Sequence, residues 1–228
     1  MYRERAAAIA GSFVWVNEVI EADAAHRVLP DGCLDLLWIG GRLVVAGPDT
    51  TARLVAGAAG TVVGLRFAPG TGPVVLGVPA NRLTDQRIPL SALWRGHQVR
   101  RLAERVAEAA DPGTALEEIA AASLRGRDTP ADRLVSAVVA GLSAGRSVAA
   151  VADEVGLSDR QLYRRSLAAF GYGPKTLARV FRMRRALVAA RSGTGLAEVA
   201  ATTGYADQAH LSREVRALAG VALTQLLG

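Results

Sequence analysis

Short apolar runs alternate with turn residues over the first third of the chain. Runs rich in β-branched and aromatic residues occupy 13–20, 26–29, 33–39, 42–47, 52–57 and 61–67. The segments PDG, GG, GPDT and APGTGP separate them, and Gly, Pro and Asp at such points are typical of tight turns. Short strands joined by turns favour an antiparallel arrangement. We therefore expect residues 1–95 to form a β-rich, sandwich or barrel-like regulatory domain.

Beyond residue 95 the apolar residues recur every three or four positions, which is typical of amphipathic helices. This spacing predicts helices over residues 99–110, 114–124 and 131–142. They form a helical connector, residues 96–145, that can pack against either neighbour. The remaining residues, 146–228, are also helical in pattern. The expected fold class is therefore an α+β multidomain protein with a β-rich N-terminal domain, a helical connector and an all-α C-terminal domain.

The last 80 residues contain an internal repeat. VAAVADEVG, residues 148–156, aligns with LAEVAATTG, residues 196–204, at an offset of 48, and the offset becomes 49 beyond the glycine. Each copy has the pattern of a short apolar helix, a turn opened by Gly156 or Gly204, and a more polar helix that ends at glycine. This order is typical of a helix-turn-helix. A helical packing repeat that binds no DNA is the alternative interpretation.

The second helix of the first copy has an apolar and a polar face. Ser158 and Gln161 form an S-x-x-Q capping box, which predicts a helix start near Asp159. At about 100° per residue, the inward positions are Leu162, Ser166, Ala169 and Phe170. The outward positions are Arg160, Gln161, Arg164, Arg165 and Ala168. Arginine suits guanine or phosphate and glutamine suits adenine, so this face can read a major groove.

The second copy and the spacer between the copies supply further candidates for DNA contact. In the second copy Asp207 is the expected cap, and the candidates are Gln208, His210 and Arg213, with ordinary surface polarity as the alternative. Residues 174–191 predict one helix of about 27 Å. Its candidates for phosphate contact are Lys175, Arg179, Arg184 and Arg191. Arg182 is either a phosphate contact or an internal ion-pair residue.

The charge distribution supports a polyanionic partner. The formal net charge is +6, of which residues 1–146 supply +1 (16 Arg against 15 acids) and residues 147–228 supply +5 (11 basic residues against 6 acids). Residues 160–191 hold nine basic residues and no acid. Solvent-exposed helix faces usually carry both positive and negative charges, whereas a stripe of basic residues alone is typical of phosphate-backbone binding. Double-stranded DNA is the expected partner.

Two segments resemble the AraC-type helix-turn-helix regulators: VADEVGLSDRQLYRRSLAAFGYGPKTLARVFRMRRAL and LAEVAATTGYADQAHLSREVRALAG. In that family two units are joined by a long helix, and their recognition helices enter successive major grooves. The resemblance places the recognition helices at 159–170 and 207–219 and implies a sequence-specific transcription regulator. Two departures stand out: VALTQLLG lacks the proline common after the final glycine, and Ser166 occupies a place often filled by a bulky apolar residue.

The N-terminal half resembles the uncharacterised β-rich domain attached to some actinobacterial-type AraC regulators, through RVLPDGCLDLLWIGGRLVVAGPDT, GLRFAPG and GVPANRLTDQRIPL. In better-known relatives the companion domain is a cupin-like barrel that binds an effector or pairs subunits. The resemblance thus implies a small-molecule effector or a homodimer. Aromatic walls with one or two charged groups are typical of a small-molecule pocket. The candidates for ligand contact are Trp15, Cys33, Asp35, Trp38 and Arg66. Core packing is the alternative for the two tryptophans.

Catalytic chemistry is not indicated. One cysteine and three scattered histidines predict no metal centre, and no acid, base and nucleophile set is visible, so we expect neither an enzyme nor a cofactor. Glu4 interrupts the basic start of a signal peptide, and no apolar run is long enough for a membrane span, which favours a cytoplasmic protein. Two rival hypotheses remain: a sequence-independent architectural DNA-binding protein, and a ligand-modifying domain fused to a DNA-binding module.

Overall fold

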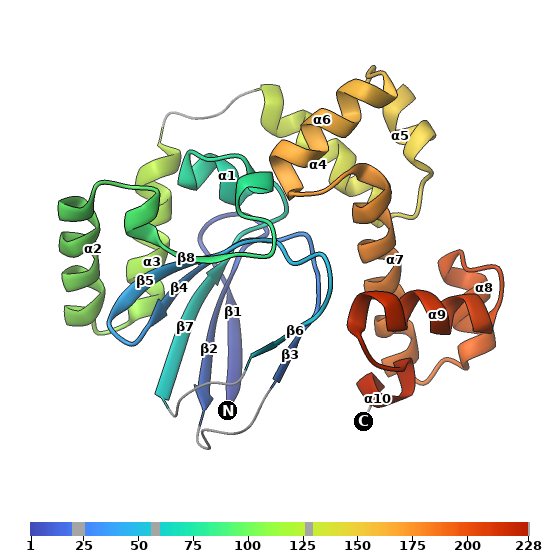
Figure 1. Cartoon of the computed structure of the whole chain (residues 1–228), viewed down its shortest axis with the longest axis horizontal. Coiled ribbons are helices and arrows are strands. Elements are labelled where there is room, and N and C mark those ends of the chain that lie inside the picture. The colour runs from blue at the N-terminus through green and yellow to red at the C-terminus, as the bar shows by residue number, and fades with distance from the viewer. Residues whose placement is uncertain (20–25, 56–59, 126–129, 228) are drawn as a thin grey trace.

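An antiparallel sheet forms the centre of the N-terminal part of the chain (Figure 1). The computed structural model describes residues 1–19, 26–55, 60–125 and 130–227. Among these, six strands are hydrogen-bonded in the order β1 (Tyr2–Ala6), β2 (Phe13–Val19), β7 (Gly60–Arg66), β4 (Asp35–Ile39), β5 (Arg42–Ala46) and β8 (Arg87–Pro89). A separate two-stranded ribbon pairs β3 (His26–Val28) with β6 (Arg53–Val55).

The two faces of the sheet have different surroundings. Side chains alternate between the faces along each strand, and on one face Leu36, Val45 and Leu65 are fully buried. Three helices pack on this face: α1 (Thr71–Leu76), α2 (Gly96–Glu108) and α3 (Pro112–Leu124). The expected β-rich antiparallel domain is confirmed, with helices in the place that a second sheet takes in a sandwich. The other face is turned toward the C-terminal helices (Figure 1).

Most of the expected strands are present, with three differences. β1 was not predicted, because its residues are exposed and carry no apolar alternation; pairing with β2 holds it at the sheet edge. The strand β8 was also not predicted from the sequence. Residues 71–76, expected as part of a turn-divided strand region, form the short helix α1. The ends of two expected strands, residue 20 and residues 56–57, lie outside the described residues.

The helical connector divides between two cores. All three expected helices are present, but α2 and α3 pack against the sheet, whereas α4 (Pro130–Ser143) packs against the C-terminal helices. Val106 and Ile119 belong to the first core, and Val138 and Leu142 to the second. Two short 3-10 helices, η1 (Ala80–Arg82) and η2 (Leu90–Ala92), flank β8.

The C-terminal part consists of two helical pairs at the two ends of one long helix (Figure 1). The first pair is α5 (Val148–Glu154) and α6 (Asp159–Phe170), the long helix is α7 (Pro174–Arg191), and the second pair is α8 (Leu196–Thr203) and α9 (Gln208–Ala219), followed by α10 (Leu223–Leu227). Leu177, Val180 and Met183 of α7 are fully buried. The long helix therefore supplies the common core of both pairs. No helix among the described residues is long and apolar enough to cross a membrane.

Candidate nucleic-acid interface and ligand pocket

The α6 helix begins and ends where local chemistry dictates. The Ser158 hydroxyl accepts a hydrogen bond from the Gln161 amide at 3.4 Å, and the Gln161 side-chain oxygen accepts one from the Ser158 amide at 2.9 Å. Gly171, at φ 84°, ends the helix in the left-handed region. The predicted capping box is confirmed. The same hydrogen bond corrects one expectation. Because the side-chain oxygen of Gln161 is engaged in the cap, the residue cannot make the bidentate contact to adenine in this conformation.

The outward face of α6 is basic and open to solvent. Arg160, Arg164 and Arg165 are exposed, and within the described residues none of them forms an ion pair. On the opposite side Leu162 and Phe170 are almost fully buried. Ser166 is also buried, and its hydroxyl has no hydrogen-bond partner in the described part of the chain. Three cationic side chains thus project from one rigid surface.

The second copy presents fewer charges. Asp207 caps α9 by accepting a hydrogen bond from the His210 amide at 2.6 Å. His210 is only half exposed: its ring nitrogen accepts a hydrogen bond from the Ala206 amide, and its ring packs edge-on against Tyr205. This replaces its expected outward role, because the side chain secures the turn. Gln208 and Arg213 are exposed as expected.

Arg216 is a further exposed cation of α9 that sequence reasoning missed. It lies one helical turn beyond Arg213, and this spacing of three places both on one side of the helix. Like Arg213, it has no ion-pair partner among the described residues. The i, i+3 spacing is the signal that could have found it.

On α7, Lys175 is exposed in the first turn, but two arginines turn toward α9. The Nε of Arg179 lies 3.0 and 3.2 Å from the two carboxylate oxygens of Glu214, and Nη2 of Arg182 lies 3.0 Å from one of them. Arg182 also lies over the Tyr205 ring, 4.7 Å from its centroid. The ion-pair interpretation of Arg182 is confirmed. For Arg179 the expected phosphate contact is corrected, because its guanidinium is already engaged with a carboxylate.

Glu214 is the centre of this ion-pair cluster. Burial acts to raise the pKa of its carboxyl group, but the hydrogen bonds and charges of Arg179 and Arg182 outweigh burial and lower it. The carboxylate therefore stays ionised, and it joins the second recognition helix to the long helix.

Arg184 is a further α7 residue for which a phosphate contact was expected. It lies on the side of α7 that faces the N-terminal sheet, together with Val188 and Arg191. These residues line a pocket of about 840 Å³ between the open face of the sheet, the β3–β6 ribbon and α7. Arg184 and Arg191 are therefore exposed lining residues of this pocket, and the phosphate contacts expected for them stay predictions.

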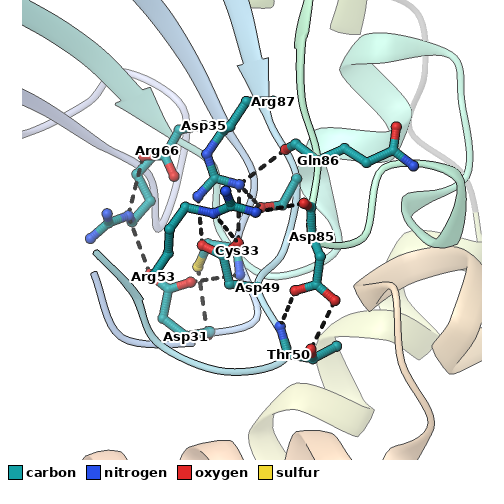
Figure 2. Close-up of polar contacts among 11 residues, drawn as sticks. Asp31, Cys33, Asp35, Asp49, Thr50, Arg53, Arg66, Asp85, Gln86 and Arg87 are labelled. Atoms are coloured by element: carbon teal, nitrogen blue, oxygen red, sulfur yellow. Dashed lines mark hydrogen bonds and ion pairs between the residues drawn. The ribbon is translucent and has the colours of Figure 1, made fainter. Parts of the chain in front are cut away.

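The floor of the pocket brings three predicted ligand residues together. Nε1 of Trp15 donates a hydrogen bond to Oδ1 of Asp35 at 2.8 Å. Nε of Arg66 lies 3.3 Å from Asp35 and 3.3 Å from Asp31 (Figure 2). The Trp15 ring lies directly against Gly64, where a Cβ would approach it to 2.2 Å. Burial raises the pKa of Asp35, and Arg66 only partly offsets this effect.

Two predicted ligand residues lie elsewhere. Trp38 is on the opposite face of β4 from Asp35 and packs against the core under the helices, so the core-packing alternative holds for it. Cys33 is 6% exposed and is not part of the pocket lining. Burial raises the pKa of its thiol well above the ordinary value, and Cys33 is a buried packing residue.

The pocket combines apolar walls with several arginines. Its arginines are Arg27, Arg53, Arg66, Arg87, Arg184 and Arg191, and its acids are Asp31 and Asp35. Arg53 and Arg87 pair with Asp49, but Arg184 and Arg191 have no acidic partner among the described residues. These arginines come from β3, β6, β7, β8 and α7, so spacing in the sequence could not group them. No cluster of three or more His, Cys, Asp or Glu side chains that could hold a metal ion occurs within the described ranges.

Comparison with protein families finds one match in the N-terminal part of the chain and one in the C-terminal part. Residues 12–89 match a family described as a domain of unknown function (DUF6597), and residues 151–228 match one described as a helix-turn-helix domain. Residues 151–228 form an AraC-type helix-turn-helix domain. This domain makes the chain a DNA-binding regulator of the helix-turn-helix type, as expected. No curated protein matches the chain significantly.

Solved structures of ToxT from Vibrio cholerae resemble the chain at low identity. One, solved at 1.65 Å, is 10% identical over 95% of this chain and 97% of that chain, with a TM-score of 0.47. A second, from strain O395, is 10% identical over 100% and 96%, with a TM-score of 0.45. A third, with bound unsaturated fatty acid, is 11% identical over 95% and 94%, with a TM-score of 0.47. These values are too low to transfer residues or ligands to this chain.

Proposed function

We propose that this regulator binds DNA sequence-specifically, with α6 and α9 in successive major grooves, and that a small molecule in the pocket controls it. The observation that carries the first part is the pair of exposed arginine faces, Arg160, Arg164 and Arg165 on α6 and Arg213 and Arg216 on α9, each opposite a buried apolar side. The two units lie at the ends of an 18-residue helix. At about 27 Å, its length approaches the roughly 34 Å turn of B-DNA.

The exposed basic residues divide into two roles by position. Arg164 lies in the middle of the α6 face, where a guanidinium fork can reach O6 and N7 of a guanine. Lys175 lies in the first turn of α7, outside the recognition helices, and suits a phosphate oxygen. Arg164 should therefore select sequence, whereas Lys175 should strengthen binding to any sequence.

Measuring affinity for a duplex selected from a random pool, and for its scrambled counterpart, tests these roles. Arg164→Ala should weaken binding to the selected duplex by about 1–3 kcal/mol and leave the scrambled duplex almost unaffected. Lys175→Ala should weaken binding to both duplexes equally. Equal losses for Arg164→Ala on both duplexes would refute base reading. Equal affinity of the wild type for unrelated duplexes would favour the architectural alternative.

The pocket chemistry favours an organic acid with an apolar or aromatic body. Leu37, Val44 and Leu187 supply apolar walls, and Arg184 and Arg191 supply cations that no acid of the described chain neutralises. Both side chains are exposed, and a guanidinium forms charge-assisted hydrogen bonds with a carboxylate, so a carboxylate would complete the site. Such a ligand would contact the sheet and α7 together.

Thermal shift with matched probes tests this ligand class. Aromatic and aliphatic carboxylic acids should raise the melting temperature, and their neutral amides should not, because ligand stabilisation requires binding to the folded state. Arg184→Gln and Arg191→Gln should reduce the shift given by the acids. Equal shifts from acids and amides, or none from either, would contradict the proposal.

A further inference from the structure

The N-terminal domain contacts the C-terminal end of the first recognition helix. The hydroxyl of Thr84 donates a hydrogen bond to the carbonyl of Gly171 at 3.0 Å. Pro48 packs on the same glycine so closely that a Cβ there would approach Pro48 Cγ to 2.5 Å. Any side chain at Gly171 would push the two domains apart, both for this reason and because φ is positive.

The N-terminal domain contacts the equivalent end of the second recognition helix. The amide of Ala52 donates a hydrogen bond to the carbonyl of Leu218 at 2.7 Å, and Nη1 of Arg27 donates one to the carbonyl of Ala219 at 2.9 Å. These carbonyls belong to the last turn of α9 and have no helical partner of their own. The domain therefore binds both recognition helices at the same point of the repeat.

A single segment of the N-terminal domain contacts the C-terminal ends of both recognition helices. We name residues 47–53 the bridging loop; its Pro48 lies against α6 and its Ala52 against α9. Four residues of extended chain span at most about 14 Å. The bridging loop therefore limits the separation of the two helix ends, independently of α7.

Ion pairs and hydrogen bonds hold the bridging loop in place (Figure 2). Asp49 is 6% exposed and accepts hydrogen bonds from Arg87 at 2.5 and 3.1 Å and from Arg53 at 3.4 Å. The carboxylate of Asp85 accepts hydrogen bonds from the amide and the hydroxyl of Thr50, at 2.7 and 2.8 Å. The loop is thus anchored at its centre as well as at its ends.

We propose that the bridging loop fixes the relative position of the two recognition helices on DNA and that Asp49 is its positioning residue. The inference rests on the proposed function, in which both helices bind one duplex. A fixed separation makes the protein discriminate between operators that differ only in the distance between their two half-sites. Arg53 and Arg87 also line the pocket, so an anion bound there would compete with Asp49 for the groups that anchor the loop.

The test varies half-site spacing in the duplex selected by the wild type. Insertion or deletion of one or two base pairs between the half-sites should weaken wild-type binding by at least about tenfold. In Asp49→Asn and Thr50→Val, which each remove a contact that anchors the bridging loop, this penalty should fall to within about threefold. Binding to a duplex with only one half-site should stay unchanged in both variants, because neither residue touches DNA. A general loss of structure would weaken half-site binding as well.

Glu118→Gln is the matched control. It removes one negative charge from an exposed ion pair with Arg105 on the far helices, and it should retain the wild-type spacing penalty. Thr50→Val removes only the hydrogen bond from the Thr50 hydroxyl to Asp85, so it tests the bridging loop if Asp49→Asn does not fold. A full spacing penalty in folded variants would overturn this inference alone. A wild type without sequence preference would overturn the proposed function and the inference with it.

Discussion

Replacement of Glu214 by Gln tests the joint between the second recognition helix and the long helix. The carboxylate faces two guanidinium groups, with contacts to Arg179 at 3.0 and 3.2 Å and to Arg182 at 3.0 Å. The Glu214 side chain is 17% exposed, against 38% for Arg179 and 26% for Arg182. Glutamine preserves the shape and one acceptor oxygen, but it leaves two neighbouring cations without their shared anion.

The expected magnitude follows from these contacts. A hydrogen bond to a charged group contributes about 1.5–3 kcal/mol net. Because Arg179 is more than a third exposed, solvent screening reduces its share toward the 0–1 kcal/mol of a surface pair. Glu214→Gln should therefore lower the free energy of unfolding at neutral pH by about 1–3 kcal/mol. In a chain of this size the melting temperature should fall by roughly 2–10 °C.

Melting curves as a function of pH provide the assay. The folded-state pKa of Glu214 lies below its unfolded value of about 4.3, so its contribution is present above that pH and is lost as the pH falls through the folded pKa. The difference between wild type and Glu214→Gln should therefore close on acidification. Glu118→Gln, at an exposed pair, should cost less than about 1 kcal/mol. A cost that does not diminish on acidification, or equal costs for the two variants, would refute this account.

Two further substitutions test the pocket and the first helical unit. Gly64→Ala would place a Cβ 2.2 Å from the Trp15 ring and displace it from the sheet, so calorimetry should show about tenfold weaker binding of the carboxylic acid that gives the largest thermal shift. Unchanged affinity would remove Trp15 from the binding site. Ser166→Ala removes a buried hydroxyl that has no partner among the described residues, so chemical denaturation should show equal or greater stability, by up to about 1 kcal/mol. A clear loss of stability would contradict that assignment.

The recognition helices were predictable because local signals determine their ends. The capping box at Ser158 and the glycine at 171 operate within a few residues of sequence, and α6 spans the predicted residues 159–170. Asp207 caps α9 for the same reason. Period and capping are properties of a single helix, so they need no knowledge of neighbouring elements.

The partner of each outward arginine was not predictable, because it depends on tertiary packing. Arg179 and Arg184 share one helix and one residue type, yet the first contacts Glu214 and the second faces the pocket. Periodicity gives the angle of a side chain around its helix, but it does not identify the element that lies there. Apart from Arg66, the arginines of the pocket escaped prediction as ligand residues for the same reason, since separate elements bring them together.

The alternation of side chains between the two faces of a strand explains why only some of the predicted ligand residues line the pocket. Trp15, Asp35 and Arg66 were grouped correctly, but Trp38 was added although it lies three residues after Asp35 in one strand. An odd separation places two strand residues on opposite faces, so the sequence already held the information to exclude it. The edge strand β1 was beyond reach, because exposed alternating charges carry no burial signal.

The most direct test of the central claim is a guanine N7 protection footprint on the selected duplex, with wild type, Arg164→Ala and Arg213→Ala. The wild type should protect two clusters of guanines about 10 base pairs apart on one side of the duplex, because N7 lies in the major groove. Arg164→Ala should lose protection in one cluster and Arg213→Ala in the other. A single cluster, or a pattern that neither substitution changes, would contradict the reading of two successive grooves by α6 and α9.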